Sequence, residues 1–322
     1  MTNASPKKIL VTGAAGFIGS ALAGRLAATG HEVVGIDNFN PYYDITLKRD
    51  RVTHLLSDVS LRELDITDAD ALSKLFQEEQ FDTVCHLAAQ AGVRYSVTNP
   101  DSYIHNNVQG MQTLLATMQA TGVPQLVYAS TSSVYGTDTP APFSETSPAD
   151  RPVSIYAATK RAGELLAHSY ASQYGLQVTA LRFFTVFGPW SRPDMAMLKF
   201  LKKMDVGEPI EVYNHGDLRR DFTYIDDIIA GFEQAVNQPF PYEIINLGYG
   251  QPVELMTMIE TLEQASGQTA KKNYAPMQTG DVYETYADTT KAAQLLNFTP
   301  QTDFATGVQA FVDWYREYYQ AK

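Results

Sequence analysis

Two side chains suited to acid–base chemistry, Tyr156 and Lys160, lie four residues apart within a helical pattern over 153–173. That spacing places both on one face of a helix. A tyrosine has a pKa near ~10, too high for a base at neutral pH, and a nearby ammonium favours its phenolate. The pair is therefore a candidate for a general base and the cation that tunes it, although this spacing is common in helices without such a role.

A run of hydroxyl side chains follows the apolar segment 125–129, which we predict to be a strand. The run consists of Ser130, Thr131, Ser132 and Ser133. In open parallel sheets, ligands bind at the carboxyl ends of the strands. We therefore expect these hydroxyls beside the Tyr156–Lys160 pair, the alternative being an ordinary Ser/Thr-rich loop.

A glycine-rich segment (GAAGFIG) lies between a predicted strand and a predicted helix. In such a segment Gly13 allows a tight turn, Gly16 lets a pyrophosphate approach the backbone, and Gly19 lets the helix pack on the sheet. The helix N-terminus then presents N–H groups to the phosphates. We predict a dinucleotide-binding loop, with contacts from Gly13, Gly16, Phe17, Ile18 and Gly19.

Asp37 directly follows the second predicted strand, 32–36. A carboxylate at this place accepts hydrogen bonds from the hydroxyls of the adenosine ribose and repels a 2′-phosphate. The sequence therefore favours NAD over NADP as the cofactor.

The elements that must position these residues alternate between strand and helix. The predicted strands are 8–12, 32–36, 61–64, 83–87, 125–129 and 178–183, and the predicted helices are 17–29, 68–79, 100–120 and 153–173. Such alternation predicts an α/β fold, a Rossmann-type doubly wound parallel sheet with helices on both faces.

The pattern changes after residue 185, where a turn-rich segment begins. We predict an NAD-binding domain over 1–185 and a smaller, mixed α/β C-terminal lobe for the substrate over 186–322. Segments around 221–248 are expected to return to the main sheet, so that the two domains are interleaved.

Composition narrows the function further. The 322 residues carry a net charge of −12, which disfavours binding to nucleic acids or anionic membranes. The single cysteine, Cys85, excludes an internal disulfide and fits a reducing, cytoplasmic compartment. The six histidines show no metal-ligand spacing, and no apolar run is long enough to span a membrane.

Together, three motifs resemble the extended short-chain dehydrogenase/reductase family over essentially the whole chain. They are 12–19 (TGAAGFIG), Tyr156-x-x-x-Lys160 and 219–227 (RRDFTYIDD). Within the family, 37–44 (DNFNPYYD), 91–96 (AGVRYS) and 188–196 (GPWSRPDMA) are most similar to nucleotide-sugar 4-epimerases, above all those that act on UDP-glucuronate.

The resemblance implies roles for single residues. Tyr156 would take the proton of the sugar 4-OH, Lys160 would tune it and hold the nicotinamide ribose, and Thr131 would bond the reacting oxygen. Arg220 would contact the diphosphate of a UDP-sugar. Further NAD contacts are implied for Asn38, Asp65, Ile66, Ala88, Ala89 and Asn106.

The family resemblance also implies a homodimer. Family dimers pair two long helices of each subunit, which here would be 100–120 and 153–173. Apolar residues of these helices, such as Leu114, Leu115 and Leu165, could equally face the protein's own core.

Two departures from related enzymes bear on the reaction. Family 4,6-dehydratases carry Asp-Glu where this chain has Ser132 and Ser133, and UDP-glucuronate decarboxylases carry Glu in place of Ser133. Many UDP-hexose 4-epimerases have Asn where Thr185 stands. These three hydroxyls could form a cradle for a sugar carboxylate. Arg192 and Arg94 could add charge there or bind the nucleotide, or could be ordinary surface arginines.

We therefore expect NAD-dependent inversion of C4 of UDP-glucuronate to UDP-galacturonate, through a transient 4-keto sugar and without decarboxylation. The alternatives are a UDP-glucose 4-epimerase, a UDP-glucuronate decarboxylase or, least expected because Tyr156 and Lys160 are both present, an NAD-sensing protein without catalysis.

Overall fold

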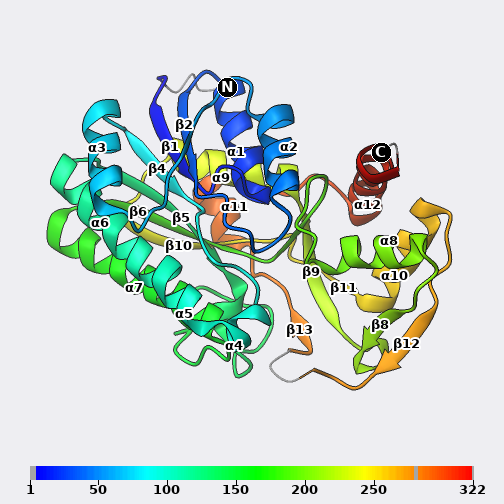
Figure 1. Ribbon diagram of the computed structural model, residues 1–322. Coiled ribbons are helices and arrows are strands. Elements are labelled where there is room, and N and C mark those ends of the chain that lie inside the picture. Colours follow the sequence, from blue (N-terminus) through cyan, green and yellow to red (C-terminus); the bar gives the residue numbers. More distant parts are fainter. Residues whose placement is uncertain (1–4, 279–281, 321–322) are drawn as a thin grey trace.

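A parallel sheet of seven strands forms the centre of the computed structural model, which describes residues 5–278 and 282–320 (Figure 1). Its strand order is β10-β6-β5-β4-β1-β2-β3. The strands are β1 (Lys8–Thr12), β2 (Glu32–Asp37), β3 (Ser60–Glu63), β4 (Thr83–His86), β5 (Gln125–Thr131), β6 (Gln177–Phe183) and β10 (Tyr242–Leu247). The predicted Rossmann-type α/β fold is confirmed.

Helices cover both faces of this sheet because its strands are apolar on both sides. One face packs against α3 (Ala69–Glu79), α6 (Gly110–Thr121) and α7 (Ile155–Tyr174). The other packs against α1 (Phe17–Ala28), α2 (Ile45–Leu55), α9 (Ile225–Asn237) and α11 (Thr290–Leu296). Packing between the sheet and these two layers of helices fixes the positions of the carboxyl ends of β1, β4 and β5.

The segment predicted as one helix over 100–120 consists of three consecutive pieces. They are α5 (Pro100–Tyr103), a π-helical segment (Ile104–Gln109) and α6. A short helix, α4 (Tyr95–Thr98), precedes them, and a 3₁₀ turn (Ser132–Tyr135) follows β5. β5 extends to Thr131, so Ser130 and Thr131 belong to the strand itself.

The second lobe lies beside the carboxyl ends of the main sheet (Figure 1). One of its sheets contains β7 (Thr185–Phe187), β9 (Arg219–Tyr224), β11 (Pro252–Glu254) and β13 (Glu284–Thr285), and a second pairs β8 (Ile210–Tyr213) with β12 (Lys272–Ala275). Its helices are α8 (Ala196–Asp205), α10 (Leu255–Ser266) and α12 (Phe304–Tyr315), which share a separate apolar core. After β9, the chain returns to the main sheet through α9 and β10.

Arg51 of α2 ties the two lobes together. Its guanidinium is fully buried and donates to the carbonyl oxygens of Ala15, at 3.1 Å, and Trp190, at 2.7 and 3.0 Å. It also bonds the Tyr43 hydroxyl at 2.6 Å. The side chain of Arg51 thus connects the glycine-rich loop to the segment before α8. No helix of the described residues is long and apolar enough to cross a membrane.

Candidate active site

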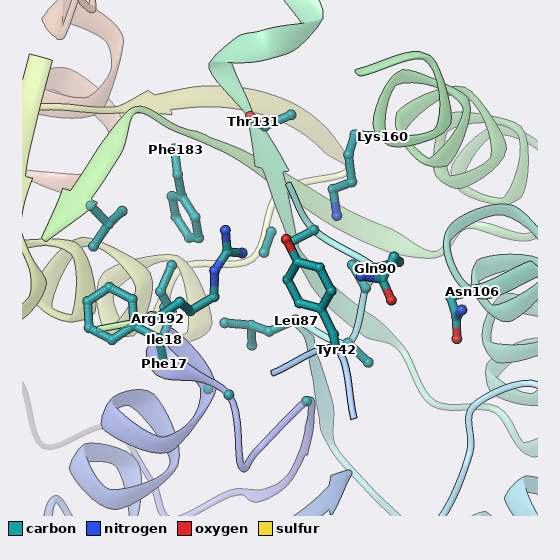
Figure 2. A pocket seen from close by; sticks show the side chains of 18 of the residues that line it. Phe17, Ile18, Tyr42, Leu87, Gln90, Asn106, Thr131, Lys160, Phe183 and Arg192 are labelled. Atoms are coloured by element: carbon teal, nitrogen blue, oxygen red, sulfur yellow. The ribbon is translucent and has the colours of Figure 1, made fainter. Parts of the chain in front are cut away.

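A cavity of about 380 Å³ opens where the carboxyl ends of β1, β4 and β5 meet the second lobe (Figure 2). It lies at the point where the strand order reverses around β1, the usual ligand site of an open α/β sheet. The predicted cofactor residues that line it are Gly13, Gly16, Phe17, Ile18, Gly19, Asp37, Asn38, Ile66, Ala88, Ala89, Asn106, Tyr156 and Lys160.

Asp65 is the one predicted cofactor residue outside this lining. Its carboxylate accepts a hydrogen bond from the Asn38 amide at 2.8 Å and others from Thr67. These bonds lower the pKa of Asp65 against the opposing effect of burial. Asp65 therefore supports Asn38, which does reach the cavity.

The glycine-rich loop has no room for a side chain at its glycine positions. A Cβ atom on Gly19 would lie 2.1 Å from the Gly13 carbonyl oxygen, and one on Gly13, whose φ is +70°, would lie 2.8 Å from the Ala88 nitrogen. Gly16, the N-cap of α1, offers no side-chain hydrogen bond to the helix start. The first N–H groups of α1 thus remain for an anionic ligand, and this cradle fits the diphosphate of NAD.

Asp37 receives more partners than the sequence indicates. One carboxylate oxygen accepts from the Ala15 amide at 3.1 Å, and the other accepts from the Phe39 amide at 2.8 Å and the Lys48 ammonium at 3.1 Å. Lys48 also lines the cavity. Sequence reasoning missed Lys48 together with its helix, although Asp44 before an apolar residue is a typical N-cap signal and does cap α2.

Tyr156 lies in the first turn of α7, whose N-terminus is capped by Ser154. Removal from water raises the pKa of Tyr156, while the Arg192 cation and a hydrogen bond with Thr131 act in the opposite direction. The Arg192 cation therefore acts on Tyr156 as well, a contribution that the sequence did not indicate, and the effect of Lys160 on the phenolate stays a prediction. Thr131 does lie beside the phenol, as expected.

The Lys160 ammonium lies over the Tyr128 ring, 4.2 Å from its centroid. Burial lowers the pKa of Lys160 to about 7. Figure 2 shows Lys160 and Thr131 at one end of the pocket, with Phe17 and Ile18 of the glycine-rich loop on the opposite side. The cation therefore faces the cavity from the end where the strand β5 hydroxyls lie.

A buried ion pair fixes helix α7 to the sheet. Glu164 accepts from the Arg182 guanidinium at 2.8 and 2.9 Å, and from Ser130 and Arg161. These bonds hold the pKa of Glu164 below its usual value against the opposing effect of burial. Sequence reasoning missed this pair, although Glu164 shares the helix face of Lys160 at the next i+4 position.

Three adjoining cavities surround the predicted substrate residues. Ser132, Ser133 and Thr185 line both the cofactor cavity and a neighbouring one of about 230 Å³. Thr185 and Arg192 also line a third cavity, of about 550 Å³. The three hydroxyls and Arg192 therefore line the same cavity as Tyr156.

Arg94 and Arg220 lie outside the cofactor cavity and line the two adjoining ones. The Arg94 guanidinium lies 5.2 Å from the centroid of the Tyr213 ring. Nη1 of Arg220 donates to the carbonyl oxygens of Arg219 and Tyr283, at 2.8 and 3.0 Å. Both arginines are thus separated from Tyr156 but border the space that leads to it.

His86 and Cys85 are buried in β4, where the sequence predicts strand-core residues. The His86 ring is 2.8 Å from the Thr12 hydroxyl, and burial lowers its pKa to about 3. Across residues 5–278 and 282–320, no group of three His, Cys, Asp or Glu side chains could hold a metal ion.

Comparisons with known proteins agree with this geometry. A UDP-glucuronate 4-epimerase of Arabidopsis thaliana is 46% identical over 97% of this chain and 77% of its own. A probable UDP-glucuronate 4-epimerase of Rhizobium meliloti is 42% identical, covering 97% of this chain and 98% of its own. The crystal structure of UDP-glucuronic acid 4-epimerase from Bacillus cereus, in complex with UDP-glucuronic acid and NAD, superimposes with a TM-score of 0.90.

That structure is 38% identical, and the match covers 97% of this chain and all of the other. The family that comprises NAD-dependent epimerases and dehydratases matches residues 9–248. Because this match spans most of the chain and the relatives align over nearly its full length, the protein belongs to the NAD-dependent epimerase/dehydratase family.

Proposed function

We propose that this protein inverts C4 of UDP-glucuronate to give UDP-galacturonate, through a transient 4-keto sugar and without decarboxylation. One observation carries the proposal. A wall of hydroxyl groups from Ser132, Ser133 and Thr185 lines the same cavity as Tyr156 and the glycine-rich loop. This combination offers a base, a dinucleotide cradle and a neutral, hydrogen-bonding place for a sugar carboxylate.

Bound NAD would supply the hydride acceptor and donor that an inversion at C4 needs. The residues that would hold it are the glycine-rich loop at its diphosphate, Asp37 and Asn38 at the adenosine, and Lys160 at the nicotinamide ribose. Ile66, Ala88, Ala89 and Asn106 complete the walls of the same cavity. Asp37 lines this cavity, and a carboxylate at this place favours the ribose hydroxyls of NAD over a 2′-phosphate.

Tyr156 takes the proton of the 4-OH and later returns it, and Thr131 bonds the same oxygen. Burial alone works against this, since it raises the pKa of the phenol. The Arg192 cation and the Thr131 hydroxyl offset it. The pKa of Tyr156 still lies above its usual value, so these two groups only reduce the effect of burial, and the positive nicotinamide ring of bound NAD would further favour the anion.

The 4-keto uronate is a β-keto acid, which loses CO₂ when the bond to its carboxylate aligns with the carbonyl π system. Hydrogen bonds to a carboxylate contribute about 1.5–3 kcal/mol each. Donors from Ser132, Ser133 and Thr185 would hold the carboxylate out of that alignment. None of the three can serve as the extra acid or base that elimination or decarboxylation uses.

Arg94, Arg192 and Arg220 bind the anionic parts of the UDP-sugar. They are concentrated around the cavities of 230 and 550 Å³, on a chain whose net charge is −12. Local cations are needed because such a surface otherwise repels a nucleoside diphosphate. The lobe after residue 185 is therefore the substrate lobe, and the domain over 1–185 is the NAD-binding one.

The protein acts as a homodimer in the cytoplasm. Leu165 of α7 and Ile104 before α6 are each more than half exposed, whereas Leu114 and Leu115 are buried in the subunit's own core. The exposed pair offers an apolar face for a second copy, and light scattering coupled to size-exclusion chromatography tests it. The lone, buried Cys85 fits a reducing compartment.

The deciding experiment is an incubation of the NAD-loaded protein with UDP-glucuronate, with the products resolved by NMR. UDP-galacturonate without a UDP-pentose is the expected result. A UDP-pentose as the main product would replace the proposal with decarboxylation. Turnover of UDP-glucose but not of UDP-glucuronate would mean that the substrate is a neutral hexose and that the three hydroxyls do not bind a carboxylate.

A further inference from the structure

A chain of polar contacts lies between the cofactor cavity and the adjoining cavity of about 550 Å³. Arg192 donates to both carboxylate oxygens of Asp194, each at 3.0 Å, and Tyr42 donates its hydroxyl to Asp194 at 3.1 Å. We call Tyr42, Asp194 and Arg192 the clasp. Figure 2 shows the Tyr42 side chain reaching across the pocket toward Arg192.

The clasp joins loops that belong to opposite sides of the site. Tyr42 lies on the loop that continues from Asp37 and Asn38, where the adenosine of the cofactor is expected. Asp194 and Arg192 lie before α8, on the substrate side. Tyr42 and Arg192 each line both the cofactor cavity and the cavity of 550 Å³, so the clasp stands between the two spaces.

The loop that carries Tyr42 is held in a defined shape. Asn38 accepts from the Asn40 amide, and Asn40 accepts from the Tyr42 amide, each at 3.0 Å. The Tyr42 ring packs on that of Tyr95, with centroids 4.8 Å apart. Gly92, at a φ of +100°, passes so close that a Cβ atom there would lie 2.7 Å from the Tyr42 hydroxyl.

A second tie between the same two loops lies deeper. Tyr43 bonds Arg51, which also bonds the carbonyl oxygen of Trp190, and Arg51 is fully buried. By contrast, the side chains of Arg192 and Asp194 are 25% and 23% exposed. The inner tie is thus shielded from water, whereas the outer clasp can exchange its contacts with water.

Charge keeps the clasp closed at neutral pH. Burial and the Asp194 carboxylate raise the pKa of Tyr42 to about 12, so its hydroxyl stays protonated and available as a donor. The two parallel bonds from Arg192 to Asp194 have the fork geometry that makes such pairs strong. Opening therefore costs a charge-assisted hydrogen bond but no change of fold.

We propose that the clasp of Tyr42, Asp194 and Arg192 closes the cofactor cavity and sets the residence time of NAD. A reaction that takes a hydride from a sugar and returns it to the same sugar leaves no net change in the cofactor. Each release of NAD would interrupt such a cycle. A contact that slows release therefore keeps the enzyme loaded between turnovers, although it does not touch the reacting atoms.

The test measures release of the cofactor without any sugar. Wild type and variants are loaded with radiolabelled NAD, chased with excess unlabelled NAD and followed by rapid filtration. Tyr42→Phe removes one hydrogen bond to a charged group, and we expect release about tenfold faster. Asp194→Ala, which removes the shared acceptor, is expected to speed release at least as much.

The double variant decides whether the two residues act as one unit. Because both single changes remove the same hydrogen bond, the double variant should release NAD no faster than Asp194→Ala alone. Tyr315→Phe is the matched control, since it removes a tyrosine–aspartate bond, to Asp205, from a place that lines no cavity described above. It should release NAD at the wild-type rate.

Two results would overturn the proposal. One is release from Tyr42→Phe and Asp194→Ala at the wild-type rate. The other is a double variant in which the two effects multiply, which would mean independent loosening. Thermal unfolding of each NAD-free variant checks that the fold is intact, and Tyr42→Phe is conservative enough to keep the test valid if Asp194→Ala is unstable.

Discussion

The part of the active site that would hold the cofactor and the part that would hold the sugar, here called the cofactor half and the sugar half, consist of different kinds of groups. The cofactor half is centred on the backbone of the glycine-rich loop, with a few side chains such as Asp37, Asn38 and Lys160 around it, on elements of the main sheet. Side chains form the sugar half, on loops and short strands that come from both lobes. A site made of backbone is fixed with the fold, whereas a site made of arginines and hydroxyls can change its ligand through single substitutions.

Tyr156 stands at the junction of the two halves, and its loss should have the largest effect. Tyr156→Phe removes the base but neither the glycine-rich loop nor the arginines. We expect kcat to fall about 10³-fold, within the range for a positioned acid–base group. Equilibrium binding of NAD and of UDP, measured by calorimetry, should stay near wild type. A variant that lost both activity and NAD affinity would instead assign Tyr156 to the cofactor half.

Gly19→Ala should damage the cofactor half alone. The new methyl group would lie 2.1 Å from a backbone oxygen of the loop, which has no flexible side chain to move. Shifts of this kind cost about 1–3 kcal/mol, so we expect NAD affinity to fall about 10- to 100-fold. Affinity for UDP should not change. Equal losses of affinity for NAD and for UDP would show that the two halves of the site are structurally coupled.

Arg220→Met should damage the sugar half alone. We expect KM for the UDP-sugar to rise about tenfold, with kcat and NAD affinity little changed, because a charge-assisted bond to the diphosphate is lost. Arg219→Met is the matched control. Arg219 is the next residue of β9 and pairs with Glu254 at 3.1 Å, away from the cavities. If both variants raised KM equally, a general loss of positive charge would explain the effect.

Thr185→Val tests the hydroxyl wall with little change of volume. Losing one donor to the carboxylate should raise the fraction of UDP-pentose a few-fold, as NMR of the products would show. The epimerisation rate should stay within about twofold. An unchanged product ratio would remove Thr185 from the cradle and leave Ser132 and Ser133 to be tested in the same way.

The smallest effect concerns the charge of Lys160. Its pKa is about 7 in the folded chain, below the ~10.4 of an exposed lysine, so the unfolded chain binds more protons between these values. Stability from this group therefore rises with pH across that window. Lys160→Met should raise Tm over wild type most at about pH 7 and less toward pH 10. Lys74→Met, at an exposed site, should show no such trend.

Most of the cofactor half could be predicted from sequence because its signals are local. The glycines, Asp37 and the strand–helix alternation lie in short segments whose geometry follows from backbone sterics. The predicted strands and helices of the first 185 residues agree with the structure to within a few residues, although the helix over 100–120 is three pieces, and helix α2, helix α4 and the 3₁₀ turn 132–135 were not predicted. Because α2 was not predicted, the roles of its residues Lys48 and Arg51 were not predicted either.

The residues of the sugar half could be named from the family resemblance, but the contacts that position them could not be predicted, because they are long-range. The bond from Tyr42 to Asp194 joins residues 152 positions apart in sequence, and Arg51 reaches Trp190 over 139. Nothing in the local pattern indicates such partners. The same holds for the effect of the Arg192 cation on Tyr156, which the helical spacing of Tyr156 and Lys160 does not indicate.

The return of the chain to its first sheet has a consequence for synthesis on the ribosome. Strand β10 pairs with β6 along six residues, and Ile228, Phe232 and Leu296 complete the apolar core under α1. Six strands of the sheet therefore emerge before β10, which covers their edge, and before α9 and α11, which complete the face that α1 and α2 cover only in part. A nascent chain that ends near residue 185 must hold that apolar surface open until the second lobe has been translated.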